Sequence, residues 1–280
     1  MKCVWQAYIN ILPHWMRPEV DKLGRERLQE LRLRVGMKPE LIFQEGVANL
    51  DKQVTNTDLA FIINSASSYS PWAAGTIPQG YLTAAGGHRI GICGVCIIQN
   101  GRITGFSSLT SLCLRVARDF QDIANHAVDI QGSLLIIGPP GSGKTTLLRD
   151  LIRCKSNINQ GSIAVVDERE ELFPMWQGQV CFSPGDRTDI ISGCNKAEGI
   201  EAVLRSMNPT WIAMDEITIQ SDAESLLHAG WCGVNLMATA HASSIDDLKT
   251  RPIYQPLIQN HLFSTVLILH RDKSWTMERM

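Results

Sequence analysis

Residues 138–150 read GPPGSGKTTLLRD, and they follow the apolar run SLLIIG at 133–138. The stretch matches the pattern G-x4-G-K-[ST] in full, between a predicted strand and a predicted helix, which is the context that a P-loop requires. In such a loop, glycines let backbone N–H groups surround phosphates, a lysine reaches the β- and γ-phosphates, and a threonine ligates Mg²⁺. The stretch therefore predicts a site for ATP with Mg²⁺, the alternative being a chance glycine turn before a helix.

Within this motif, Lys144 is the residue expected on the phosphates and Thr145 the residue expected on the metal ion. The residues around them supply the loop and the start of the following helix. The predicted nucleotide-binding residues of the motif are Gly138, Pro139, Pro140, Gly141, Ser142, Gly143, Lys144, Thr145 and Thr146.

Apolar runs that alternate with helical segments continue to the end of the chain, at 162–168, 210–216, 235–241 and 265–270. This alternation predicts an α/β domain over residues 132–280, with a parallel sheet covered on both faces. Ligands then bind at the carboxyl ends of the strands. The run 162–168 lies between the P-loop and the run 210–216, so an extra strand separates the two nucleotide motifs, as in RecA-like P-loop folds.

Acidic residues end two of these runs. Asp215 suits a role in orienting Mg²⁺ and its waters, and Glu216 suits polarisation of the attacking water. A solvated pair that caps the next helix is the alternative. After the earlier run, Asp167 is a candidate metal ligand, while Glu168 and Glu171 are candidate catalytic acids around the metal water. These three residues equally fit an exposed charged turn held by the intervening arginine.

Residues 1–117 have a different texture and predict a smaller α+β domain, joined by a linker at 118–131. Helical spacing covers residues 2–12, and residues 25–41 change from helical to strand-like. The segment TNTDLAFIINSASSYS (55–70) predicts a helix capped by Thr55 or Thr57. Asn100–Gly101, between β-branched runs, predicts a hairpin turn.

Composition narrows the function classes. The 280 residues carry a formal net charge of -2, so there is no global basic field for nucleic acid, and the seven tryptophans are scattered. Residues 1–15 do not form a signal peptide, and no apolar run is long enough to cross a bilayer, which predicts a soluble cytoplasmic protein. The pair Cys93 and Cys96 has no second ligand pair nearby, so we expect small buried residues rather than a metal or redox site.

The ordered set of motifs resembles the type II/IV secretion ATPase superfamily and, more closely, the stage III sporulation AA family. The carrying stretches span residues 80–245: GYLTAAGGHRIGICG, LRVARDF, the P-loop, VVDEREEL, GIEAVLRSMNPTWIAMDEI and ATAHASS. The superfamily's Walker A, Asp, Walker B and His boxes correspond to 138–145, 167–171, 205–216 and 239–241. The chain departs from the sporulation pattern at Thr218, where glycine is usual.

This resemblance implies a hexameric ring in which ATP lies between the N-terminal domain and a RecA-like C-terminal domain. It implies arginines that reach the nucleotide from the N-terminal domain or a neighbouring subunit, because a guanidinium holds a γ-phosphate bidentately. Arg89, Arg115 and Arg118 lie in the matching segments, and Arg205 begins the Walker B box. Structural ion pairing is the alternative for each.

The resemblance also gives His241 a role. Its strand is expected beside the P-loop strand, so a neutral imidazole could hydrogen-bond the attacking water or Glu216 and sense the γ-phosphate. The alternative is a histidine that satisfies a backbone carbonyl at the strand end.

Three alternative functions are compatible with these features. The first, implied by the resemblance, is an ATP-hydrolysing motor that drives an integral membrane platform protein. The motor itself is expected to be peripheral to the membrane, on the mother-cell side of the channel between mother cell and forespore. The second is a nucleic-acid-dependent RecA-like ATPase, although nucleic acid is not the expected partner. The third is a nucleotide-regulated binding module with little turnover, against which the intact Glu216 argues.

Overall fold

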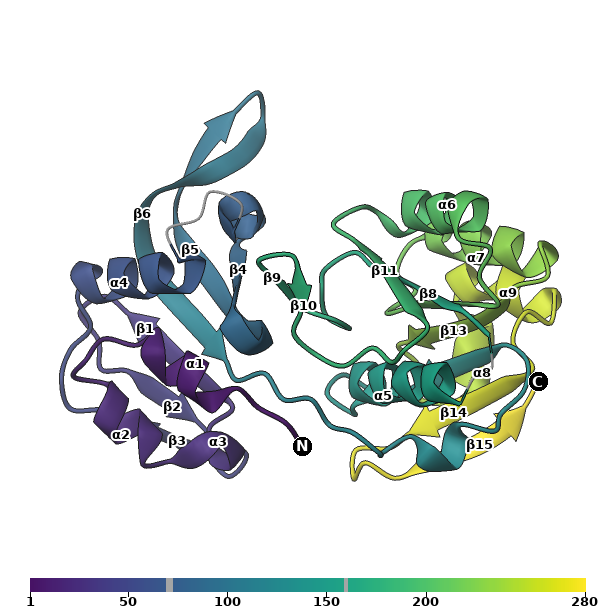
Figure 1. Ribbon diagram of the computed structural model, residues 1–280, viewed down its shortest axis with the longest axis horizontal. Helices are drawn as coiled ribbons and strands as arrows, with labels where there is room; N and C mark the ends of the chain where they lie inside the picture. The colour runs from purple at the N-terminus through teal and green to yellow at the C-terminus, as the bar shows by residue number, and fades with distance from the viewer. Residues whose placement is uncertain (69–72, 159–160) are drawn as a thin grey trace. The chain divides into compact units, whose positions relative to one another are not determined.

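The computed structural model describes residues 1–68, 73–158 and 161–280, which form two compact units (Figure 1). The first unit contains residues 1–119 together with 174–182, and the second contains residues 120–173 and 183–280. In the described residues, no helix is both long and apolar enough to span a membrane.

The first unit combines short helices with an antiparallel sheet. Among its described residues, the strand order is β3-β2-β1-β6-β5-β4, and every neighbouring pair is antiparallel. Apolar side chains of α1, α4 and the central strands form its core. Its elements are α1 (Trp5–Asn10), α2 (Arg17–Asp21), α3 (Gly24–Arg27), β1 (Glu30–Arg34), β2 (Glu40–Ile42), β3 (Val47–Asn49), α4 (Asn56–Ser67), η1 (Ala73–Gln79), β4 (Tyr81–Ala84), η2 (Ala85–Gly87), β5 (His88–Gln99), β6 (Arg102–Arg115), β9 (Met175–Trp176) and β10 (Gln179–Val180).

The helix cap and the hairpin turn that the sequence predicts in the first unit are both present in the structure. Thr55, rather than Thr57, caps α4, and Tyr69 and Ser70 at the end of the predicted helix lie outside the described residues. The predicted hairpin joins β5 to β6, with Asn100 and Gly101 both at positive φ (51° and 73°), as a type I′ turn requires.

The expectation that Cys93 and Cys96 are buried is wrong, because both are exposed. β4 pairs with β5 only over residues 88–91, and β1 pairs with β6 only over residues 111–115. The two cysteines follow that paired part of β5, where β5 and β6 continue as a two-stranded ribbon.

The second unit is a mostly parallel sheet between helices, which confirms the predicted RecA-like α/β class. Among its described residues, the order is β11-β8-β12-β13-β7-β14-β15, and only β14 and β15 pair antiparallel. Its elements are η3 (Asn125–Ala127), β7 (Leu134–Ile137), α5 (Lys144–Asn157), β8 (Ile163–Asp167), β11 (Thr188–Ser192), α6 (Lys196–Ser206), β12 (Trp211–Met214), α7 (Gln220–Trp231), β13 (Asn235–Ala240), α8 (Ile245–Thr250), η4 (Pro252–Tyr254), α9 (Gln255–Gln259), β14 (Thr265–Leu269) and β15 (Trp275–Arg279).

Side-chain alternation places helices on both faces of this sheet. On β7, Leu135 and Ile137 join the core cluster that α6 and α7 cover, and Figure 1 shows these two helices side by side. Leu134 and Ile136 are also fully buried, and alternation along a strand points them to the opposite face, where α5 contacts β7.

The order of the strands determines which motifs meet. β13, which leads to His241, pairs with the P-loop strand β7 on one side and with β12 on the other. The strand that separates the two nucleotide motifs in the sheet is therefore β13. The strands of this sheet that separate them in sequence are β8 and β11, and both lie on the far side of β12.

The predicted linker at 118–131 is packed rather than free from Phe120 onward, where the chain already belongs to the second unit. The N–H of Ala124 donates to the carboxylate of Asp150 at 2.8 Å. The buried ammonium of Lys155 donates to the carbonyls of Val128 and Ile130 at 2.9 and 2.7 Å. Burial lowers the pKa of Lys155 to about 8, because an ammonium is poorly solvated there.

Candidate functional site

The P-loop, residues 138–143, connects β7 to α5. Thr145 and Thr146 lie in the first turn of α5. Gly143 adopts φ +104°, which a side chain would disfavour, and a Cβ on Gly138 would lie 2.7 Å from the carbonyl oxygen of Leu269. The hydroxyl of Ser142 is buried and has no hydrogen-bond partner among the described residues. A buried polar group without a partner is costly, so this hydroxyl suits contact with a bound phosphate oxygen.

Lys144 is the cation of this loop. Its Nζ donates to the carbonyl oxygens of Gly138 (3.0 Å) and Pro139 (3.2 Å) and lies 3.1 Å from Nδ1 of His241. Burial lowers the pKa of Lys144, while Glu216 and Asp215 oppose that shift. Because its hydrogen-bond partners are neutral groups, the ammonium fits a phosphate anion at this position.

Thr145 and Asp215 supply hard oxygen atoms where a magnesium ion is expected. Thr145 Oγ1 donates to Asp215 Oδ2 at 2.6 Å. Thr239 Oγ1 donates to the other carboxylate oxygen at 2.5 Å and accepts from the backbone N–H of Glu216 at 2.9 Å. Hydroxyl and carboxylate oxygens are the ligands that Mg²⁺ prefers, so the pair fits this ion.

His241 connects the P-loop lysine to the carboxylate of Glu216. Its Nε2 lies 2.8 Å from Glu216 Oε1, and its Nδ1 lies 3.1 Å from Lys144 Nζ. An ammonium can only donate and a carboxylate can only accept, so Nδ1 accepts and Nε2 carries the proton. The two contacts together fit a neutral imidazole with one defined tautomer.

Glu216 is held at its backbone as well as its side chain. Its φ is +49°, in the left-handed region that residues with a Cβ rarely adopt. Its carbonyl oxygen accepts from Lys196 Nζ, and the next N–H, of Ile217, donates to the carbonyl of Thr239 at 2.9 Å. The carboxylate is thereby directed toward His241.

The carboxylate of Asp167, the last residue of β8, holds the loop that follows this strand. Asp167 accepts from the backbone N–H groups of Glu171 (2.9 Å), Leu172 (3.0 Å) and Phe173 (2.8 Å). Burial raises the pKa of Asp167, and these N–H donors oppose the shift. Its predicted role as a metal ligand stays a prediction.

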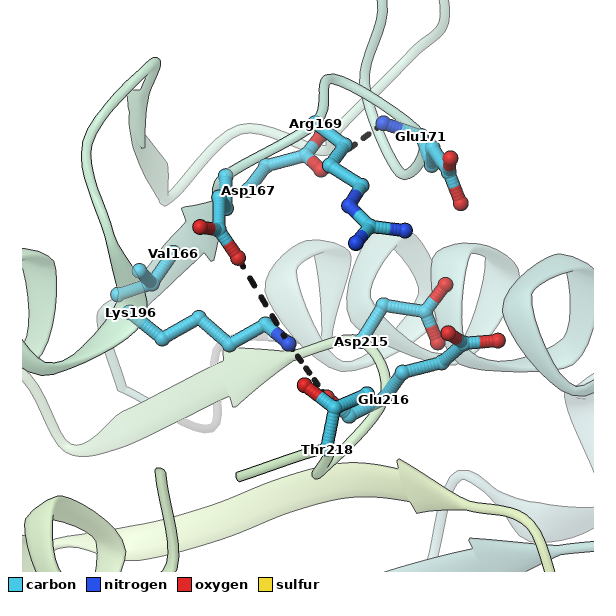
Figure 2. Close-up of a pocket in the computed structure, with 9 residues that line it drawn as sticks. Val166, Asp167, Arg169, Glu171, Lys196, Asp215, Glu216 and Thr218 are labelled. Carbon is cyan, nitrogen blue, oxygen red and sulfur yellow. Dashed lines mark hydrogen bonds and ion pairs between the residues drawn. The ribbon is translucent and has the colours of Figure 1, made fainter. Parts of the chain in front are cut away.

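Glu168 and Glu171 lie in the same pocket as Asp215 and Glu216, shown in Figure 2. A carboxylate oxygen of Glu168 lies 3.8 Å from Lys196 Nζ. The catalytic role of both glutamates stays a prediction. The pocket is lined by Val166, Asp167, Glu168, Arg169, Glu171, Lys196, Asp215, Glu216 and Thr218.

Each of the arginines predicted to contact nucleotide has a partner within its own unit. The alternative of structural ion pairing is observed for Arg115 and Arg205, whereas the partners of Arg89 and Arg118 are an aromatic ring and backbone carbonyls. The role of all four at the phosphates stays a prediction. Arg89 lies 4.1 Å from the centre of the Tyr81 ring, Arg115 lies 3.3 Å from a Glu30 oxygen, Arg118 donates to the carbonyls of Arg25 and Leu28, and Arg205 lies 2.5 Å from a Glu201 oxygen.

The structure adds two residues that the sequence did not single out. Thr239 shares a strand face with His241, since the two are separated by one residue, so strand alternation was a usable signal. Lys196 lies far along the chain from the P-loop and from Glu216, and its sequence gives no sign of its contacts.

A P-loop after β7, with the acid-ended strand β12 one strand removed in the same parallel sheet, defines a RecA-like P-loop fold. The solved structures bear out this class. The pilus retraction motor PilT, with bound ADP, has a TM-score of 0.62 and 16% identity, over 90% of this chain and 76% of PilT. The ATPase DotB of Legionella pneumophila has a TM-score of 0.57 and 17% identity, over 96% of this chain and 80% of DotB.

The model of the family Sporulation stage III, protein AA matches residues 7–277, so the chain belongs to this family. Stage III sporulation protein AA of Bacillus subtilis (strain 168) is 35% identical over 277 residues, which cover 94% of this chain and 90% of that protein. The resemblance inferred from the ordered motifs is thereby confirmed.

Proposed function

We propose that this chain is the ATP-hydrolysing motor of a secretion-type apparatus and that it energises the channel between mother cell and forespore. The observation that carries the proposal is the continuous contact from Lys144 through His241 to Glu216, beside the Thr145–Asp215 pair. The family is a sporulation family, and the solved structures that share this fold include an ATPase and a pilus retraction motor.

In this proposal, the P-loop holds the phosphates. Lys144 leaves its carbonyl partners for the β- and γ-phosphates, and Ser142 donates its hydroxyl to a phosphate oxygen. Thr145 and Asp215 would hold Mg²⁺, with Asp167 as a further candidate, and the chemistry that the ion would supply is neutralisation of charge on the phosphates. Glu168 and Glu171 order water near the metal ion.

Glu216 is the general base. Its carboxylate accepts the proton of the attacking water, and the Nε2–H of His241 orients that carboxylate. When Lys144 moves to the γ-phosphate, Nδ1 of His241 loses its donor and can accept from water instead. His241 therefore senses whether the γ-phosphate is present.

The motor acts as a ring, with a hexamer as the expected form. Arg89, Arg115, Arg118 and Arg205 are the candidates to reach the nucleotide within a subunit or across a subunit boundary. The ring is cytoplasmic and associates with the membrane through an integral membrane platform protein on the mother-cell side. Nucleotide-driven domain motion transmits force to that partner.

The test compares phosphate release from Mg·ATP and ADP affinity in the wild type, Glu216→Gln and His241→Ala. Both variants should lower turnover about 10²-fold or more, because Glu216→Gln removes the base and His241→Ala removes the side chain that orients it. Both should leave ADP affinity within about threefold. His228→Ala is the matched control, an exposed histidine of α7 beside Glu201. Wild-type turnover in Glu216→Gln would contradict the proposal.

A further inference from the structure

Lys196 occupies an unusual place for a lysine. It is the first residue of α6 and is only 8% exposed, although a cation is unfavourable at a helix N-terminus and a buried ammonium is costly without partners. Its Nζ donates to the carbonyl oxygen of Glu216 and lies 3.5 Å from Asp222 Oδ2 and 3.8 Å from Glu168 Oε2. These contacts compensate the buried charge and connect the start of α6 to the segments that follow β12 and β8 and to the first turn of α7.

The contact with Glu216 falls at a residue whose backbone lies in the left-handed region. Glu216 has φ +49°, so its peptide orientation must be held by its surroundings. Thr239 of β13 accepts from its N–H, and His241, the residue that follows β13, contacts its carboxylate. Lys196 holds the carbonyl oxygen from α6, so Glu216 is fixed from two elements that lie on different sides of β12.

Asp222 completes the connection. Its Oδ2 accepts from the N–H and the hydroxyl of Thr218 (2.9 and 3.1 Å) and from the N–H of Ile219 (3.2 Å). The carboxylate thus orders the segment that follows Glu216, and its charge faces Lys196. Lys196 therefore holds the carbonyl of Glu216, and Asp222 holds the N–H of Thr218, which belongs to the next peptide group along the chain.

We propose that Lys196 is a positioning residue for Glu216: it fixes the left-handed turn so that the carboxylate faces His241 and the P-loop. The inference rests on the proposed function, in which Glu216 is the general base. It adds that α6, through a single ammonium, sets the orientation of that base, and that Glu168 connects the acidic segment after β8 to the same ammonium.

The test is Lys196→Met, which keeps the side-chain length and removes the donor and the charge. We expect kcat to fall about 10²-fold, the loss associated with a misplaced reacting group, while ADP affinity stays within about threefold. Lys155→Met is the matched control, because Lys155 is also buried and also donates to backbone carbonyls, but at Val128 and Ile130. Its kcat per folded molecule should match the wild type, even if its unfolding temperature falls further.

Lys196→Arg keeps the charge and serves if Lys196→Met does not fold. A guanidinium is bulkier than an ammonium and holds its donors in a fixed planar fork, so it does not match the place of the ammonium against the Glu216 carbonyl, and kcat should fall with ADP affinity unchanged. Wild-type kcat in either variant, or an equal kcat loss in Lys155→Met, would overturn the positioning role. Absence of phosphate release from the wild type, in a protein that binds ADP, would instead overturn the proposed function.

Discussion

His88 illustrates how one buried side chain couples the stability of the first unit to pH. The ring is fully buried at the start of β5, with Nε2 3.0 Å from the carbonyl oxygen of Val4 and Nδ1 3.0 Å from the N–H of Ala117. The carbonyl needs a donor and the N–H needs an acceptor, so only the neutral imidazole satisfies both. Burial lowers the pKa of His88 to about 4, from its ordinary value of 6.5.

The consequence is loss of stability in acid. Between pH 6.5 and about 4, the unfolded chain binds a proton at this residue while the folded chain does not, so the free energy of unfolding falls as the pH falls. The full difference is about 3 kcal/mol. Urea unfolding of wild type and His88→Gln across this range measures it, and the variant should lose less stability. The exposed His126→Gln should keep the wild-type slope; equal slopes in wild type and His88→Gln would contradict the assignment.

The residues of the site differ in how far sequence could identify them. The P-loop is contiguous, so Lys144 and Thr145 are recognisable in one short motif, and Asp215 and Glu216 end an apolar strand. Their pairwise contacts depend on β13 lying between β7 and β12. The place of β13 beside β7 was expected from the resemblance and is confirmed, whereas its pairing with β12 comes from the folded sheet. Lys196 meets Glu216 through the packing of α6 and could not be inferred from spacing.

At the scale of single elements, the capping residues at the N-terminus of α4 contribute to the free energy of unfolding by an amount that can be measured. Thr55 accepts from the N–H of Asp58, and the carboxylate of Asp58 accepts from the N–H of Thr55. This reciprocal pair satisfies donors that a helix start leaves unpaired.

Thr55→Ala should therefore lower the free energy of unfolding by about 1 kcal/mol. Thr57→Ala, inside the first turn and exposed, should be neutral or slightly stabilising, because alanine has the higher helix propensity. Urea midpoints at an unchanged denaturant slope give both values. An equal loss in the two variants would show that the cap contributes nothing specific.

Elements with a strong apolar pattern were predictable, and the sheet edges were not. The predicted strands correspond to β7, β8, β12, β13 and β14, all with buried side chains. The edge strands β11 and β15 were missed, because their side chains are partly or mostly exposed and polar residues interrupt the pattern. Edge strands are defined by pairing with a neighbour, which sequence periodicity does not report.

At the scale of the whole molecule, the chain does not divide at one point. Residues 174–182, which the sequence assigns to the ATPase domain, pack with the first unit as the β9–β10 hairpin, and β9 contacts β4. In the first unit, a Cβ on Gly87 would lie 3.3 Å from Cys181 and Pro174. The composition of residues 174–182 does not indicate that they pack with the first unit, because the segment is short and its contacts are with residues far away in sequence.

The ring motor that we propose predicts that activity depends on assembly, because an arginine of the neighbouring subunit is a candidate to complete each active site. The most direct measurement is phosphate release from saturating Mg·ATP, per subunit, as protein concentration is raised through the assembly range, with Glu216→Gln as the background. A ring motor should show a specific activity that rises cooperatively with protein concentration and reaches a plateau once rings form. A specific activity that is constant at every concentration, or one that is indistinguishable from the Glu216→Gln background, would contradict it.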